Sequence, residues 1–184
     1  MKKISALLTA VSVFALNSAA RAEDLNEYIP YVGVDYTYTE GVAKFERPHF
    51  NSGSVNVGTY YNRYFGTELF YQYSDDYKDG RGADRFKTSF QAYGLDLMGY
   101  LPLWCDNVIS LVGTVGIGEY TFHHEFSSAK DRRDHGYGYR AGVGLLYNFT
   151  ENWGVRAMVR YVGLDQIEGF DHMMEYSAGI RYTF

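Results

Sequence analysis

An alternation of apolar and polar residues with a period of two constrains this chain more than any other feature. In the clearest stretch, Val155 and Val159 share one face while Arg156 and Arg160 share the other. Successive side chains of a β-strand point to opposite faces, so the pattern predicts strands with one apolar and one charged side. Because such segments recur at about the 9–11 residues that a membrane-crossing strand requires, they favour a transmembrane β-barrel.

Eight segments of this kind are predicted, at residues 28–39, 53–62, 66–74, 85–101, 108–122, 135–149, 153–164 and 175–184. Within the fifth, the glycine-rich run from Gly113 to Gly118 leaves open which side chains face inward and whether a β-bulge is present. The connections alternate between short ones (62–65, 102–107 and 150–152) and longer polar ones (40–52, 75–84, 123–134 and 165–172).

This alternation of connection lengths predicts the topology. Outer-membrane barrels have short periplasmic turns and longer external loops, and lipid tolerates no unpaired strand edge. We therefore predict an all-β, eight-stranded antiparallel up-and-down transmembrane barrel with both chain ends in the periplasm.

The placement of charged and aromatic residues distinguishes a membrane barrel from a soluble one. A soluble barrel buries its apolar face, whereas here charges and glycines share the face opposite the apolar one. Aromatic residues gather near the segment ends, as is typical of girdles at membrane interfaces. The periplasmic group comprises Tyr61, Phe65, Tyr100, Trp104, Phe149, Trp153, Tyr182 and Phe184, and the external group Tyr38, Tyr73, Tyr139, Tyr161 and Tyr176.

The N-terminus carries an export signal. A basic start, Lys2-Lys3, is followed by an apolar run to Leu16 and by a small-x-small cleavage site that ends at Ala22. The run is shorter than the roughly 20 residues of a spanning helix, so residues 1–22 are predicted to be a cleaved signal peptide and residues 23–184 the barrel domain. Cleavage would remove three of the 17 bases and leave 14 against 22 acids. An acidic exported chain is a poor candidate for binding nucleic acid.

The last nine residues, Tyr176 to Phe184, read Tyr-Ser-Ala-Gly-Ile-Arg-Tyr-Thr-Phe. With the eight segments, they resemble the outer-membrane β-barrel domain family, which includes the transmembrane domain of outer-membrane protein A and the neisserial opacity proteins. The resemblance covers Tyr28 to Phe184 and implies a location in the bacterial outer membrane. It further implies that Tyr182 and Phe184 form a signal read by the barrel-assembly machinery. The partners it implies are outer-membrane lipids, lipopolysaccharide, and host or environmental surface ligands at the loops.

Charged residues within the strands predict a network in the lumen. A lipid-facing Arg or Lys costs about 2–4 kcal/mol at the bilayer centre, so the strand charges should point inward. The predicted inward set is Asp35, Glu68, Asp96 and Glu175 against Arg140, Arg156, Arg160 and Arg181. Side chains just fill an eight-stranded interior. We therefore predict a packed, ion-paired lumen without a wide pore, with a narrow water and ion path as the alternative.

The sequence predicts no catalytic residue, no metal site and no cofactor. His123, His124, Glu125 and His135 have the chemistry of a Zn²⁺ or Cu²⁺ site, but adjacent histidines on a strand point to opposite faces, which favours polar surface loops. The resemblance also brings in lipid A palmitoyltransferases and deacylases, yet no motif of those enzymes surrounds His123, Glu125 and the serines that follow. Cys105 is the only cysteine, so the chain has no internal disulfide.

These observations predict a non-enzymatic integral outer-membrane protein whose external loops serve envelope integrity or adhesion. The alternatives are a lipid A-modifying enzyme of the outer membrane and a narrow pore. Because one fold hosts many functions, the choice between them rests on the site and not on the barrel.

Overall fold

The computed structural model describes residues 28–43, 48–79, 86–103, 108–126, 132–165 and 170–184. Nine strands account for most of this described part: β1 (Ile29–Ala43), β2 (His49–Tyr60), β3 (Phe65–Ser74), β4 (Tyr77–Asp79), β5 (Phe86–Pro102), β6 (Ile109–Phe126), β7 (Arg132–Asn148), β8 (Trp153–Asp165) and β9 (Phe170–Thr183). Within the same residues, no helix has the length and apolar character needed to cross a membrane.

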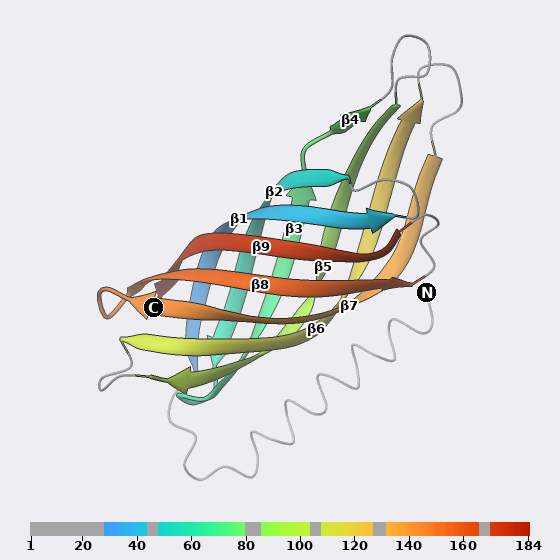
Figure 1. Ribbon diagram of the computed structural model, residues 1–184. Helices are drawn as coiled ribbons and strands as arrows, with labels where there is room; N and C mark the ends of the chain where they lie inside the picture. The colour runs from blue at the N-terminus through green and yellow to red at the C-terminus, as the bar shows by residue number, and fades with distance from the viewer. Residues whose placement is uncertain (1–27, 44–47, 80–85, 104–107, 127–131, 166–169) are drawn as a thin grey trace.

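Eight of these strands form a closed antiparallel barrel (Figure 1). Neighbouring strands pair in an up-and-down meander, β3 pairs with β5, and β1 pairs with β9 from Tyr31↔Thr183 to Ala43↔Phe170. Pairing of the first strand with the last leaves no open edge along the barrel, which is the condition that lipid imposes. The predicted eight-stranded up-and-down barrel is therefore confirmed.

At the outer end β1, β2, β6, β7 and β9 extend further than the sequence predicted, whereas β5 has its predicted length. β5, β6 and β7 comprise 17, 18 and 17 residues, more than the roughly 9–11 that cross a bilayer. With the short β4, which pairs with β5, they rise as a wall on one side of the barrel (Figure 1). Parts of the predicted loops 40–52, 75–84, 123–134 and 165–172 are therefore strand, because the backbone pairing that begins in the membrane continues through polar residues above it.

The register determines which side chains face the lumen. Along β6, Tyr120 is fully buried whereas Leu111 and Val115 are exposed, and β6 pairs with β5 and β7 without a register shift. The glycine-rich run is thus a regular strand with its even-numbered residues inward and no bulge. A register shift occurs instead between Val42 and Ala43, where β1 meets the outer end of β9.

The aromatic girdles are largely where the sequence predicted them. The exposed members are Phe65, Phe149, Trp153 and Phe184 at the periplasmic end, and Tyr73, Tyr139, Tyr161 and Tyr176 toward the outer end. Trp104 lies outside the described residues. The prediction is wrong for Tyr100, which is only 5% exposed. This residue occupies an inward-facing position of β5, so its ring lies in the lumen.

Candidate functional site in the charged lumen

Charged side chains fill the middle of the lumen. The eight that the sequence assigned to the interior all expose 6% or less of their surface: Asp35, Glu68, Asp96, Arg140, Arg156, Arg160, Glu175 and Arg181. Four carboxylates face four guanidinium groups, so the formal charges cancel. The acids lie on β1, β3, β5 and β9 and the bases on β7, β8 and β9. Barrel closure therefore brings together charges from opposite ends of the chain.

Arg156 makes the tightest contacts of the set. Its guanidinium binds Asp35 in a bidentate manner, through Nη2 to Oδ2 and through Nε to Oδ1 at 3.1 Å, and Nη1 donates to Glu68 Oε2 at 2.6 Å. Asn56 Nδ2 also donates to Asp35 Oδ2, at 2.8 Å. Bidentate hydrogen bonds between charged groups are among the strongest in proteins. Arg156 therefore links β8 to β1 and β3 through the lumen.

Arg181 lies among tyrosines near the periplasmic end. Its guanidinium carbon is 3.8 Å from the ring centroid of Tyr31, within the range of a cation–π interaction. Nη1 donates to the hydroxyls of Tyr60 at 2.5 Å and Tyr100 at 3.2 Å, and Nη2 donates to Glu68 Oε2 at 3.2 Å. We call these three rings the tyrosine cage. The alternation placed Tyr31 and Tyr60 on inward faces, but it gave no sign that the hydroxyls converge on one arginine.

The other two arginines are held more loosely. Arg140 Nη2 lies 3.5 Å from Asp96 Oδ2 and 3.6 Å from Glu175 Oε2. Arg160 Nη1 donates to Ser177 Oγ at 2.9 Å, and no carboxylate of the described residues lies within 4.0 Å of its guanidinium. Arg160 is the register neighbour of Glu175, yet that carboxylate contacts Arg140 instead. The sequence predicted four paired arginines, and the described residues show ion pairs at three.

Glycines beside the charged residues give them room. Gly116 is paired in register with Asp96, and a Cβ there would collide with the carboxylate. Gly142 is paired with Arg160, and a Cβ there would lie 2.6 Å from Arg160 Cγ. Glycine in a strand interior weakens the strand but permits such close approach. The inward glycines therefore leave space that the long charged side chains occupy.

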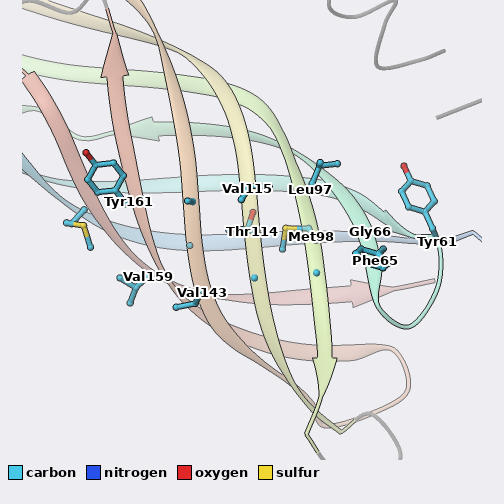
Figure 2. Close-up of a pocket in the computed structure, with 15 residues that line it drawn as sticks. Tyr61, Phe65, Gly66, Leu97, Met98, Thr114, Val115, Val143, Val159 and Tyr161 are labelled. Carbon is cyan, nitrogen blue, oxygen red and sulfur yellow. The ribbon is translucent and has the colours of Figure 1, made fainter. Parts of the chain in front are cut away.

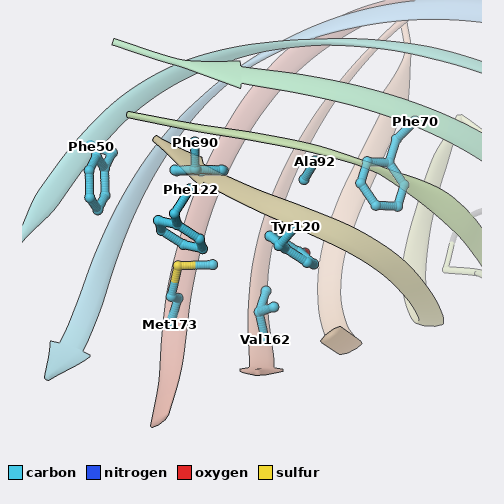
Figure 3. Close-up of a cluster of buried hydrophobic side chains, with 8 residues drawn as sticks. All are labelled: Phe50, Phe70, Phe90, Ala92, Tyr120, Phe122, Val162 and Met173. Atoms are coloured by element: carbon cyan, nitrogen blue, oxygen red, sulfur yellow. The ribbon is translucent and has the colours of Figure 1, made fainter. Parts of the chain in front are cut away.

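Buried apolar side chains lie on the outer side of the charges. This outer cluster comprises Phe50, Phe70, Phe90, Ala92, Tyr120, Phe122, Val162 and Met173 (Figure 3). Phe90 has its ring centroid 5.4 Å from that of Phe50 and 5.5 Å from that of Phe122, separations typical of favourable aromatic pairs. This apolar cluster was not predicted from the sequence. The signal was the period of two, which continues outward along β6 from Tyr120 to Phe122.

A second group of buried apolar side chains lies toward the periplasmic end. This inner cluster comprises Met98, Tyr100, Val112, Leu146 and Met158, with Tyr60 packed against it. Tyr60 and Tyr100 have ring centroids 4.9 Å apart and also belong to the tyrosine cage. The inner cluster and the cage together form a layer of side chains on the periplasmic side of Asp96, Arg140 and Arg160.

Among the residues that the structure describes, the surface candidates of the sequence do not come together in a site. His123 lies on β6, and His135 on β7 forms a hydrogen bond with Thr121 at 2.9 Å. Among the described residues, no group of three or more His, Cys, Asp or Glu could hold a metal ion. The side chains of His124 and Glu125, the serines at 127 and 128, and Cys105 lie outside the described residues.

The described residues form a groove on the lipid face. It runs from Tyr61 and Phe65 past Leu97 and Val143 to Tyr161 (Figure 2). Its lining is almost wholly apolar and its floor includes glycine backbone. The groove therefore mainly offers contact with hydrocarbon.

Backbone hydrogen bonds hold the end of the last strand in place. Phe184 N donates to Pro30 O at 3.0 Å and Thr183 N to Asn152 O at 2.7 Å. The Phe184 ring is 67% exposed at the periplasmic end. Its role with Tyr182 as an assembly signal stays a prediction.

Comparison with known proteins gives one family and several similar folds. The chain matches the model of the outer membrane protein β-barrel domain over residues 6–184, a range that begins within the predicted signal peptide. A search of curated proteins finds no match. Neisserial surface protein A is similar with a TM-score of 0.71 and 14% identity, over 84% of this chain and 97% of that one.

Two further solved structures are similar over most of their length. Ail, the attachment invasion locus protein of Yersinia pestis, solved with the heparin analogue sucrose octasulfate, has a TM-score of 0.64 and 12% identity over 86% of this chain and all of that one. The outer membrane protein OprG of Pseudomonas aeruginosa has a TM-score of 0.60 and 12% identity over 86% and 97%. At such identities the likeness concerns the fold.

Proposed function

Because this chain belongs to the outer membrane protein β-barrel domain family, and is thus a protein of the bacterial outer membrane, we propose that it is a non-enzymatic barrel with a closed lumen. The observation that carries the proposal is the filled interior. Its charged side chains expose 6% or less and cancel in formal charge. Catalytic carboxylates or imidazoles need access to a substrate, and an interior this full offers none.

Two measurements test this part of the proposal. Planar-bilayer recordings of the purified protein should show no large steady conductance, because a filled eight-stranded lumen has no room for one. Lipid A from cells with and without the protein should have the same acyl pattern by mass spectrometry. Stable open channels would favour a pore, and a changed acyl pattern would favour the enzyme alternative.

We infer that the outer wall binds anionic surface polysaccharide. Along the sequence, residues 78–87 run from β4 to β5, two of the strands of this wall. Residues 78–87 carry more bases than acids: Lys78, Arg81, Arg85 and Lys87 against Asp79 and Asp84. Sulfated glycans carry dense negative charge that such a segment would attract. The similar barrel Ail, an attachment protein by name, was solved with a sulfated heparin analogue, which supports this inference by analogy of fold.

Binding of proteoliposomes to immobilised heparin tests the surface role. Arg81→Gln with Arg85→Gln should weaken the binding and reduce its dependence on salt, because fewer charges would then be screened. Arg63→Gln is the matched control, since this exposed arginine lies in the turn between β2 and β3 at the opposite end of the barrel. Equal binding by the wall variant and wild type, or equal loss in the control, would contradict adhesion through the wall.

A further inference from the structure

Two separate sets of side chains lie at the two ends of the lumen, with looser charges between them. Along β8, Arg160 lies between Met158 of the inner cluster and Val162 of the outer cluster. Along β5, Asp96 lies between Met98 of the inner cluster and Ala92 of the outer cluster. The two clusters have no residue in common.

We propose that the lumen is an occluded chamber with two independent seals. The outer cluster closes it toward the outside, and the inner cluster with the tyrosine cage closes it toward the periplasm. Asp96, Arg140 and Arg160 are enclosed by these seals and do not themselves form the barrier, whereas Arg181 lies within the tyrosine cage and Arg156 on the periplasmic side of Met158. This inference rests on the closed lumen proposed above and adds where the closure resides.

Physical reasons favour the apolar residues as the barrier. Hydrophobic constrictions exclude water and ions because nothing in them replaces hydration. Phe50, Phe90 and Phe122 are fully buried and pack ring against ring. By contrast, Arg140 meets its carboxylates only at 3.5 and 3.6 Å, and Arg160 has a hydroxyl as its hydrogen-bond partner. Solvent that passed the outer cluster would find charged groups that can bind it.

Thr114 provides a reporter position inside the chamber. It lies on β6, inward-facing and 4% exposed, two residues from Val112 of the inner cluster and on the periplasmic side of Tyr120. Its hydroxyl has no hydrogen-bond partner among the described residues, so Thr114→Cys removes no contact there. Replacing the native cysteine by Cys105→Ser makes this thiol the only one in the chain.

The experiment measures labelling of this thiol from each side of a reconstituted membrane. The probe is a charged, membrane-impermeant methanethiosulfonate, and folding is checked by heat-modifiable gel migration. With both seals intact, the thiol should stay unlabelled from either side. Labelling at this stage would refute the closed lumen and with it the proposed function.

Opening one seal at a time then tests the further inference itself. Phe90→Ala with Phe122→Ala should permit labelling only from the outer side. Leu146→Ala with Met158→Ala should permit it only from the periplasmic side. If the outer variant does not fold, Phe122→Ala alone is the milder substitution at the same seal.

The outcomes separate the two proposals. A folded seal variant that stays protected, or that is labelled from both sides, would overturn the two-seal proposal although the wild-type lumen is closed. The charge variant Arg160→Ala leaves both seals in place and should stay protected. Labelling of that variant would assign the barrier to the charges and would likewise overturn the proposal.

Discussion

Replacing Arg156 by alanine should be the most damaging single change in the charged lumen. The substitution removes the bidentate contact to Asp35 and the 2.6 Å hydrogen bond to Glu68. Glu68 keeps Arg181 at 3.2 Å and Tyr31 at 2.9 Å, whereas the described contacts of Asp35 shrink to the amide of Asn56. Breaking a buried ion pair costs about 3–5 kcal/mol because it leaves one charge uncompensated.

Arg160→Ala is the matched comparison on the same strand. Arg160 is equally buried but makes one hydrogen bond, to Ser177. Loss of a hydrogen bond to a charged group costs about 1.5–3 kcal/mol. The midpoints of these ranges differ by about 2 kcal/mol, so we expect the free energy of unfolding to fall by about that much further in Arg156→Ala than in Arg160→Ala. This ranking comes from the structure, since the sequence treated both arginines alike.

Urea unfolding in detergent micelles, followed by tryptophan fluorescence, measures both variants. A second substitution tests the cause: Asp35→Asn added to Arg156→Ala removes the uncompensated carboxylate and should restore part of the lost stability. The reasoning fails if Arg160→Ala is as destabilised as Arg156→Ala. It also fails if Asp35→Asn lowers the stability of the Arg156 variant further.

Two further predictions concern the glycines and the C-terminus. Gly116→Ala should lower the free energy of unfolding because its Cβ would collide with Asp96. Gly113→Ala, which has no atom within 4 Å of its added Cβ, should leave that free energy unchanged or raise it by up to about 1 kcal/mol. Equal effects would refute the steric argument. Phe184→Ala should reduce the amount of heat-modifiable barrel in cells more than Phe149→Ala, another exposed periplasmic aromatic, and equal amounts would argue against an assembly signal.

The sequence by itself determined the architecture. The alternation of apolar and charged residues, as at Val155, Arg156 and Val159, indicates which face of a strand contacts lipid. The alternating lengths of the connections indicate the direction in which each strand crosses the membrane. Both signals are local, since each depends only on neighbours along the chain and on the two-residue period of a strand. The same rule assigned the eight charged residues to the interior before any pairing was known.

Only the tertiary structure decided which side chains contact one another in the lumen. Contacts such as Arg156 with Asp35 join residues 121 positions apart and depend on strand tilt, register and closure, which no local pattern specifies. For the same reason Glu175 turns to Arg140 and not to its register neighbour Arg160. For the outer cluster and Tyr100, the two-residue period indicates the inward face, but only closure decides which rings meet one another there.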